Sequence, residues 1–283
     1  MDDKDVRAFA SKLTGTALRA GAVTLHYFKN DAQEATKKAD GSPVTLADQE
    51  AEVLILEDLK KFVPEIPVIA EEAVSRGEVP DVGSRFFLVD PLDGTREFTG
   101  GSGEFTVNIG LIEDGEPVFG IVYAPALGDL YVTLGNNEVV MAKVVSPESP
   151  GDVELASLEL QSIATRATGD AGLTVVASKS HGSSEGDSWI EALPMPVTGR
   201  RNIGSSLKFC LVARGEADLY PRHGPTMEWD TAAGHAVLRA AGGLVTRIDG
   251  APFRYGKTDT GYRNTGFIAY SSDGLRQRLA VGA

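Results

Sequence analysis

Cysteine is almost absent from this sequence. The only one among 283 residues, Cys210, lies in an apolar run, which excludes an internal disulfide and favours a buried thiol in a reducing compartment. Long apolar runs are missing too, since none approaches the roughly 20 residues that a membrane-spanning helix requires. The opening residues, MDDKDVRAF, lack the basic and apolar regions of a signal peptide. We therefore expect a cytoplasmic protein with no transmembrane segment, and a peripheral position at the inner membrane face stays open.

Positive charge is also scarce. The chain has 27 Lys and Arg residues against 40 Asp and Glu residues, which gives a formal net charge of −13. Because no broad basic face can be assembled from this balance, a nucleic-acid polymer is excluded as the expected partner. A small anionic ligand would require metal ions or a local basic pocket. The oligomeric state is not fixed, and both a monomer and a homodimer are compatible with the sequence.

The hydrophobic pattern predicts a mixed α/β or α+β protein. Apolar residues at helical spacing predict helices over residues 5–28 and 45–62, and the turn-rich segment after residue 86 predicts an antiparallel meander up to residue 144. The second half alternates strands near residues 173–177, 196–198, 217–220 and 244–248 with helices near residues 187–193, 205–214 and 230–241. The Pro, Ser and Gly-rich segment 146–154 is the best candidate for a linker.

Two carboxylates follow one buried strand. The apolar run FFLV ends at Asp90, and Asp93 comes three residues later, before Gly94. Carboxylates this close repel each other in a partly desolvated site, and a divalent cation such as Mg²⁺ would remove that repulsion. On this stretch alone, an ordinary turn after a strand is an equal alternative, because Asp, Pro and Gly are common turn residues.

Other acids also lie where apolar elements end. Glu71 follows a short apolar run, for which a solvated acidic turn is the alternative. Asp230 begins a predicted helix and suits an N-cap, while Thr45 and Asp48 have the spacing of a capping box. If the strands before Glu71 and Asp90 are neighbours, their ends meet and the acids form one site.

Two separated motifs together resemble a known family. The segment DPLDGT at residues 90–95 and the segment WDTAAG at residues 229–234 are similar to the paired signature of the inositol monophosphatase superfamily of Mg²⁺-dependent, lithium-sensitive phosphatases. The upstream Glu-Glu pair and KADGSPVTLAD at residues 38–48 extend the resemblance over nearly the whole chain. Residues 90–112, 175–181 and 204–234 look most like its bacterial CysQ-type 3'(2'),5'-bisphosphate nucleotidases.

The resemblance implies a fold and a division of labour. The expected fold is the layered αβαβα sandwich of the inositol monophosphatase and fructose-1,6-bisphosphatase type. Residues 1–150 would form an N-terminal α+β half that carries most metal ligands. Residues 151–283 would form a C-terminal α/β half that carries the last metal ligand and the nucleotide contacts.

The resemblance also implies a metal site and a phosphate site. Two or three Mg²⁺ ions would be held by four carboxylates and one backbone carbonyl. The carboxylates are those of Glu71, Asp90, Asp93 and Asp230, and the carbonyl is that of Leu92. Glu71 would orient or deprotonate the attacking water, and Thr95 paired with Asp48 would position it. The backbone N–H groups of Gly94 and Thr95 would bind the transferred phosphate, so that the substrate is contacted by Glu71, Leu92, Asp93, Gly94, Thr95 and Asp230.

The remaining substrate contacts come from the second half. Ser206, Lys208 and Arg222 resemble the residues for a second phosphate, and His181 resembles a residue near the adenine. A solvated helix residue is an equal alternative for Lys208, and an ordinary loop histidine is one for His181. Arg200 and Arg201 are a further alternative for the basic pocket.

The implied activity is removal of the 3'-phosphate from adenosine 3',5'-bisphosphate, which gives AMP and phosphate in sulfur assimilation. The 3'-phosphorylated sulfate donor PAPS is a second expected substrate, and Li⁺ or Ca²⁺ should inhibit. A phosphatase for inositol 1-phosphate or histidinol phosphate on the same scaffold is the nearest alternative. A non-catalytic protein that binds metal or nucleotide is the alternative from another class.

Overall fold

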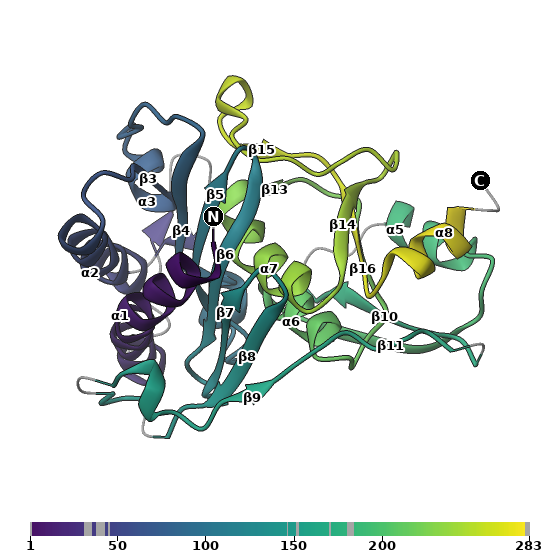
Figure 1. Ribbon diagram of the computed structural model, residues 1–283, viewed down its shortest axis with the longest axis horizontal. Helices are drawn as coiled ribbons and strands as arrows, with labels where there is room; N and C mark the ends of the chain where they lie inside the picture. The colour runs from purple at the N-terminus through teal and green to yellow at the C-terminus, as the bar shows by residue number, and fades with distance from the viewer. Residues whose placement is uncertain are drawn as a thin grey trace.

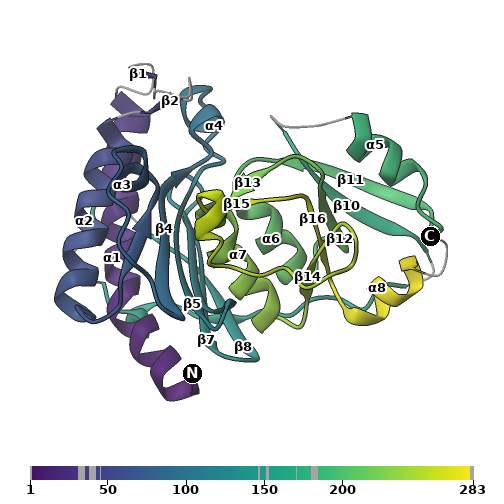
Figure 2. The same ribbon diagram turned by 90° about the horizontal axis from the view of Figure 1, so that it is seen from above.

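The computed structural model describes residues 2–30, 36–37, 43–44, 46–145, 147–150, 153–169, 171–179 and 184–280. Two β-sheets alternate with three layers of helices (Figures 1 and 2). This arrangement confirms the expected αβαβα sandwich. Among the described residues, no helix is long and apolar enough to cross a membrane.

The first sheet has seven strands in the order β3-β4-β5-β6-β7-β8-β9. They are β3 (Val68–Ala70), β4 (Arg85–Asp93), β5 (Thr106–Glu113), β6 (Glu116–Ala124), β7 (Asp129–Gly135), β8 (Glu138–Lys143) and β9 (Gln161–Ser162). Strands β3 and β4 are parallel and the others antiparallel, so the predicted meander is confirmed. The prediction that the strand ends before Asp90 is wrong, because β4 continues to Asp93 with an irregular register between the two aspartates.

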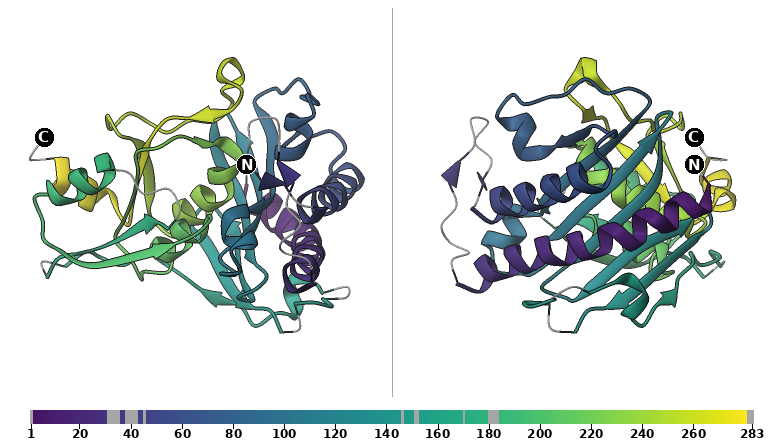
Figure 3. Two further views of the ribbon diagram at one scale, coloured as in Figure 1. Left: turned by 180° about the vertical axis from the view of Figure 1, so that it is seen from behind. Right: turned by 60° about the vertical axis from the view of Figure 1, so that its left-hand side comes forward.

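Two helices, α1 (Asp3–Asn30) and α2 (Leu46–Phe62), cover the outer face of this sheet, as the right-hand view of Figure 3 shows. Their apolar stripes, which include Leu13 and Ile55, are fully buried against sheet residues such as Phe87 and Ile109. Each such side chain contributes about 1.5–3 kcal/mol through burial, so this layer is a stable base for the strand ends. Two short helices at the strand ends, α3 (Glu71–Ser75) and α4 (Thr95–Thr99), were not predicted.

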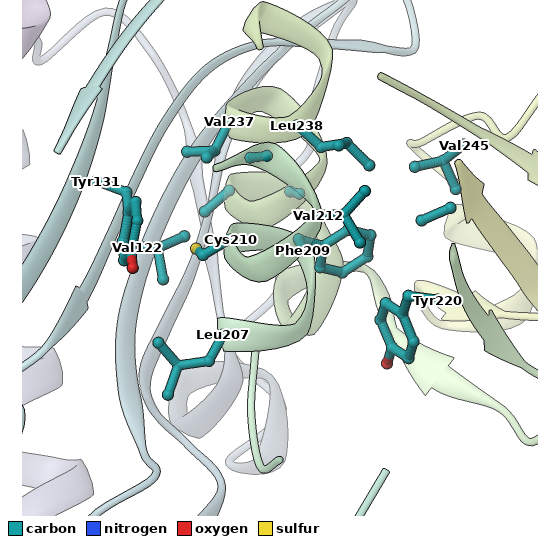
Figure 4. Packing of buried hydrophobic residues seen from close by; sticks show 14 of the residues in the cluster. Val122, Tyr131, Leu207, Phe209, Cys210, Val212, Tyr220, Val237, Leu238 and Val245 are labelled. Atoms are coloured by element: carbon teal, nitrogen blue, oxygen red, sulfur yellow. The ribbon is translucent and has the colours of Figure 1, made fainter. Parts of the chain in front are cut away.

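The middle layer consists of α6 (Leu207–Ala213) and α7 (Glu228–Ala240), which lie between the two sheets. Figure 4 shows α6 side chains packed between Val122 and Tyr131 on one side and Tyr220 and Val245 on the other. Helix α7 lies so close to the first sheet that a Cβ atom at Gly120 would come within 2.4 Å of a helix carbonyl. The glycine therefore lets the middle of α7 pack directly on β6.

The second sheet has the order β11-β10-β12-β16-β14. Its strands are β10 (Leu173–Ser178), β11 (Val197–Ile203), β12 (Leu219–Arg222), β14 (Leu244–Arg247) and β16 (Phe267–Tyr270). Helices α5 (Ser184–Glu191) and α8 (Asp273–Ala280) cover its far face with residues such as Ile190 and Leu275. The small antiparallel pair of β13 (Thr226–Met227) and β15 (Arg263–Asn264) lies beside the start of α7 (Figure 2). The sequence did not predict β13, β15, β16 or α8.

Two elements of the predicted C-terminal half contact the sheet of the N-terminal half. Strand β9 and helix α7 come after residue 150, yet β9 pairs in the first sheet and α7 packs on it. The division at residue 150 stays a prediction. Between α1 and α2, β1 (Thr36–Lys37) and β2 (Pro43–Val44) form an antiparallel pair that the sequence did not predict. Thr45 and parts of the predicted linker lie outside the described residues.

Candidate active site

A cavity of about 290 Å³ opens where the ends of β4 and β12 meet the starts of α4, α6 and α7. Most of the predicted site residues line it, although they come from segments far apart in the sequence: Glu71, Asp93, Gly94, Thr95, Ser206, Lys208, Arg222 and Asp230. Asp90 and Leu92 lie behind this wall and are 1% exposed. The fold therefore brings both motifs and the acid before α3 to one place.

Strand pairing explains why the first acids meet. Ala70 at the end of β3 lies beside Val89 in the parallel register of β4. The next residues are Glu71, which begins α3, and Asp90, so both carboxylates leave the same edge of the sheet. The two strands are neighbours, so the condition on which the sequence made the meeting of these acids depend is fulfilled.

The carboxylates perturb one another. Burial raises the pKa of Asp90 well above its usual range, and the negative charges of Glu71, Asp93 and Asp230 raise it further. Burial also raises the pKa of Asp230, with Asp93 and Glu71 as the next causes. Burial raises the pKa of Asp93, but the Lys208 ammonium and hydrogen bonds from Ser206 oppose the rise. The acidic end of the cavity thus holds more negative charge than its cations balance.

This donor set fits a hard divalent cation. It offers only carboxylate and carbonyl oxygens, which Mg²⁺ prefers, and their mutual repulsion would be relieved by a bound ion. Within the described ranges, no three His, Cys, Asp or Glu side chains converge closely enough to form a finished metal cage. The acids are near enough to raise each other's pKa, which is the repulsion that a bound cation would relieve.

The turn after Asp93 is shaped by Gly94. Its φ of 95° lies in the left-handed region, and a Cβ atom there would come within 3.1 Å of the Glu104 carbonyl oxygen. Thr95 begins α4, and its hydroxyl donates to the Leu92 carbonyl oxygen at 3.5 Å. Asp48 is 1% exposed near the start of α2. The predicted pairing of Thr95 with Asp48 stays a prediction.

Ser206 connects several of these groups. Its hydroxyl lies 2.7 Å from the carbonyl oxygen of Asp230 and 3.1 Å from Oδ2 of Asp93, and its single proton serves one acceptor at a time. The Nδ2 group of buried Asn108 donates to the same hydroxyl at 2.9 Å. The sequence missed Asn108, and the only signal was one amide within an otherwise apolar strand. Ser206 therefore links metal-ligand candidates of both halves, while its predicted phosphate contact stays a prediction.

The same cavity wall carries two cations, Lys208 and Arg222, here named its basic end, and Lys208 lies near enough to Asp93 for its charge to oppose the rise in the pKa of that carboxyl. Lys208 is 5% exposed, and its ammonium donates to the carbonyl oxygens of Ser205 at 2.6 Å and Ile203 at 3.3 Å. Burial lowers the pKa of Lys208 to about 8, although the charge of Asp93 opposes this. Arg222 is partly buried, and its guanidinium donates to the carbonyl oxygens of Gly224 and Pro225. These two cations are placed for an anion inside the cavity.

Some predicted residues do not contribute. His181 lies outside the described residues. Neither Arg200 nor Arg201 lines the cavity, since Arg200 pairs with Asp187 and Arg201 with Glu216 at the surface, so the alternative basic pocket is wrong. The cavity wall also contains residues that the sequence did not indicate: Arg96, Glu97, Ser178, Thr226, Met227 and Trp229. Trp229 could have been suggested, because it precedes Asp230 in the motif.

Comparisons with known proteins agree with this geometry. The sequence profile of the inositol monophosphatase family matches residues 4–276. The 3'(2'),5'-bisphosphate nucleotidase CysQ of Shigella flexneri is 40% identical over 243 residues, which cover 83% of this chain and 87% of that protein. The protein of the same name from Salmonella typhimurium is 44% identical over 234 residues, with the same coverage of 83% and 87%.

Solved structures show the same fold. The crystal structure of CysQ from Bacteroides thetaiotaomicron, a bacterial member of the inositol monophosphatase family, matches with a TM-score of 0.77. It is 35% identical, and the match covers 93% of this chain and 97% of that one. An inositol monophosphatase from Anabaena matches with a TM-score of 0.67 at 25% identity, covering 99% and 98% of the two chains.

Proposed function

The chain belongs to the inositol monophosphatase family, and from this premise we propose that it is a Mg²⁺-dependent phosphomonoesterase that hydrolyses the 3'-phosphate of adenosine 3',5'-bisphosphate. The observation that carries the proposal is the polarity of one cavity, which joins an acidic end to a basic end. Curated relatives named 3'(2'),5'-bisphosphate nucleotidase support it at 40% and 44% identity. PAPS, which carries the same 3'-phosphate, is proposed as a second substrate.

A substrate with two separate anionic groups fits the two ends of the cavity. The phosphate to be removed would lie at the acidic end, where it needs cations to offset the carboxylates. The second phosphate would lie at the basic end against Lys208 and Arg222, which both line the wall. Ammonium and guanidinium groups form strong, charge-assisted hydrogen bonds with phosphate oxygens. A monophosphate of a neutral polyol leaves the basic end without a partner.

Named groups divide the work of hydrolysis. Bound Mg²⁺, as two or three ions, supplies neutralisation of the phosphoryl charge and lowers the pKa of water. Four carboxylates and one carbonyl oxygen would hold these ions: those of Glu71, Asp90, Asp93 and Asp230, and that of Leu92. Glu71 accepts the proton of the attacking water. The Thr95 hydroxyl with Asp48 orients that water, and the backbone N–H groups of Gly94 and Thr95 bind the phosphate oxygens.

The test is phosphate release from a panel of substrates, with added Mg²⁺ and after treatment with EDTA. The panel contains adenosine 3',5'-bisphosphate, PAPS, adenosine 2',5'-bisphosphate, inositol 1-phosphate and histidinol phosphate. We expect the highest kcat/KM for the 3',5'-bisphosphate and none without the metal. A higher kcat/KM for inositol phosphate would assign the chain to the alternative phosphatase. No release from any substrate would favour a non-catalytic binding protein. The role in sulfur assimilation depends on the same result.

A further inference from the structure

A buried ion pair lies behind the cavity wall, at the start of α7. The carboxylate of Glu228 is fully buried. It accepts hydrogen bonds from the backbone N–H groups of Gly256 at 2.8 Å and Lys257 at 3.0 Å, and from the Lys257 ammonium at 2.7 Å. A buried carboxylate is stable only when it is paired and hydrogen-bonded in this way. The loop after β14 is therefore fixed to the first residue of α7.

The Lys257 ammonium uses all three of its hydrogens. One goes to Glu228, one to Oδ1 of Asn264 at 2.9 Å and one to the carbonyl oxygen of Arg254. The ammonium also lies 5.4 Å from the ring centres of both Phe253 and Tyr255, a distance typical of cation–π contacts. No other side chain offers three tetrahedral donors on a stem of this length.

Asn264 carries the connection from this lysine to the cavity. Its Nδ2 group donates to the carbonyl oxygen of Met227 at 3.0 Å and to Oγ1 of Thr231 at 3.0 Å. The N–H of Met227 in turn donates to Oδ2 of Asp230 at 2.8 Å. Met227, Asp230 and Thr231 all line the cavity. The peptide unit that Asn264 holds is thus next to the one that orients the Asp230 carboxylate.

The same loop contains a strained residue. Tyr262 is not glycine, yet its φ is 63°, and it is 2% exposed. Its carbonyl oxygen accepts from the Glu228 N–H at 2.9 Å, and its own N–H donates to the Lys257 carbonyl oxygen at 2.8 Å. Left-handed backbone at a bulky residue persists only where surrounding contacts impose it, and such residues gather at functional sites. The loop is held against α7 at the expense of local strain.

From these contacts we infer that Glu228, Lys257 and Asn264, here named the Glu228 cluster, position Asp230 and the cavity wall of β13 for metal binding. The inference rests on the proposed function. The cluster residues touch neither substrate nor metal, so they are positioning residues that act through Met227. Groups that orient a metal ligand typically change metal affinity by about 10- to 100-fold when removed.

The experiment measures Mg²⁺ binding directly in the full chain. The protein has two tryptophans, and Trp229 lines the cavity next to Asp230, so a Trp189→Phe background leaves one fluorescent reporter at the site. Lys257→Met removes the ion pair. Asn264→Leu removes the contact to Met227 without adding a buried charge, and it decides the test if Lys257→Met fails to fold. Arg166→Met is the matched control, because it breaks another ion pair with a buried partner, Asp218, away from the cavity.

We expect the Mg²⁺ concentration at half-maximal fluorescence change to rise about tenfold in Lys257→Met and in Asn264→Leu. Saturating Mg²⁺ should then restore most of kcat, which a merely structural role would not produce. Arg166→Met should lower the melting temperature and leave the Mg²⁺ midpoint unchanged. A midpoint in folded Asn264→Leu within twofold of the background protein would overturn the inference. The background protein's own rate on adenosine 3',5'-bisphosphate decides the proposed function separately.

Discussion

The two ends of the cavity differ in whether their buried charges already have stabilising partners. At the acidic end, burial and neighbouring carboxylates raise the pKa of Asp90 and Asp230. At the basic end, the buried ammonium of Lys208 is already stabilised by two carbonyl oxygens, and its pKa is lowered to about 8. The acidic end therefore requires cations before it accepts an anion, whereas the basic end accepts one directly. On the proposed function, metal at the acidic end would control turnover, and the second phosphate at the basic end would control selection.

Removing a ligand at the acidic end should have the largest effect. We expect Asp93→Asn to lower kcat/KM on the order of 10³-fold. Loss of a metal ligand removes several kcal/mol of charge stabilisation from the transition state, and this loss corresponds to that factor. Phosphate release with saturating Mg²⁺ measures it, and circular dichroism checks the fold. Asp249→Asn is the matched control, since Asp249 is exposed, does not line the cavity, and contacts Arg247 and the Ala251 N–H at the surface. Unchanged activity in Asp93→Asn would remove Asp93 from the site.

Removing the cation at the basic end should affect binding more than turnover. Lys208→Met should raise the KM for adenosine 3',5'-bisphosphate by about 10- to 100-fold, since a hydrogen bond to a charged group contributes roughly 1.5–3 kcal/mol. The kcat should change little. Steady-state kinetics give both constants. Lys143→Met, at an exposed lysine paired with Asp129, should behave like the unmodified protein. A large fall in kcat with constant KM would place Lys208 at the acidic end instead.

The basic end should also show a pH dependence with a defined sign. Only the ammonium form of Lys208 binds phosphate, and its pKa of about 8 lies below the ordinary 10.5. As pH rises above 8, the charged fraction falls, so the KM should rise up to about tenfold per pH unit. Rate profiles between pH 7 and pH 10 measure this. The rise should disappear in Lys208→Met, and a rise that persists there would assign the titration to another group.

The last expected effect concerns stability, not activity, and is the stabilisation of the fold by Mg²⁺. The pKa values of Asp90 and Asp230 are raised above 3.8, so the metal-free protein loses stability as pH rises through those raised values. At a Mg²⁺ concentration of 100 Kd, binding stabilises by about 2.7 kcal/mol, which corresponds to roughly 5–10 °C in Tm. Thermal melts should show a larger Mg²⁺ effect at pH 7.5 than at pH 5. An equal increase in Tm at both pH values would show that Asp90 and Asp230 are not the groups that bind the metal.

The sequence predicted those parts of the site that depend on residues close together in the chain. The apolar runs before Glu71 and Asp90 both end in an acid, which allowed the two acids to meet if the strands are neighbours, and β3 and β4 do run side by side. It could not predict Asn108, because an amide in an apolar strand has many structural explanations. It also missed Lys257, whose partners depend on how a distant loop folds onto α7.

Asp230 shows why local and functional readings of one residue can coexist. The N-cap interpretation of Asp230 is wrong, because Met227 is the N-cap of α7 and Asp230 is its third residue. The Asp230 carboxylate nevertheless accepts the Met227 N–H, and it also lines the cavity. The capping contact fixes the orientation of the side chain, so one hydrogen bond serves both the helix and the site. Sequence spacing alone does not separate the two roles, since both place an acid in the first turn.

The most direct test of the two-ended cavity compares adenosine 3',5'-bisphosphate with adenosine 3'-monophosphate, which lacks the second phosphate. Both present the same phosphate to the acidic end, so the ratio of their kcat/KM values with saturating Mg²⁺ isolates the basic end. From the strength of charge-assisted hydrogen bonds, we predict a ratio of about 10 to 100 in favour of the bisphosphate. A ratio near one would contradict the assignment of Lys208 and Arg222 to the second phosphate, and with it the separation of metal-dependent turnover from substrate selection.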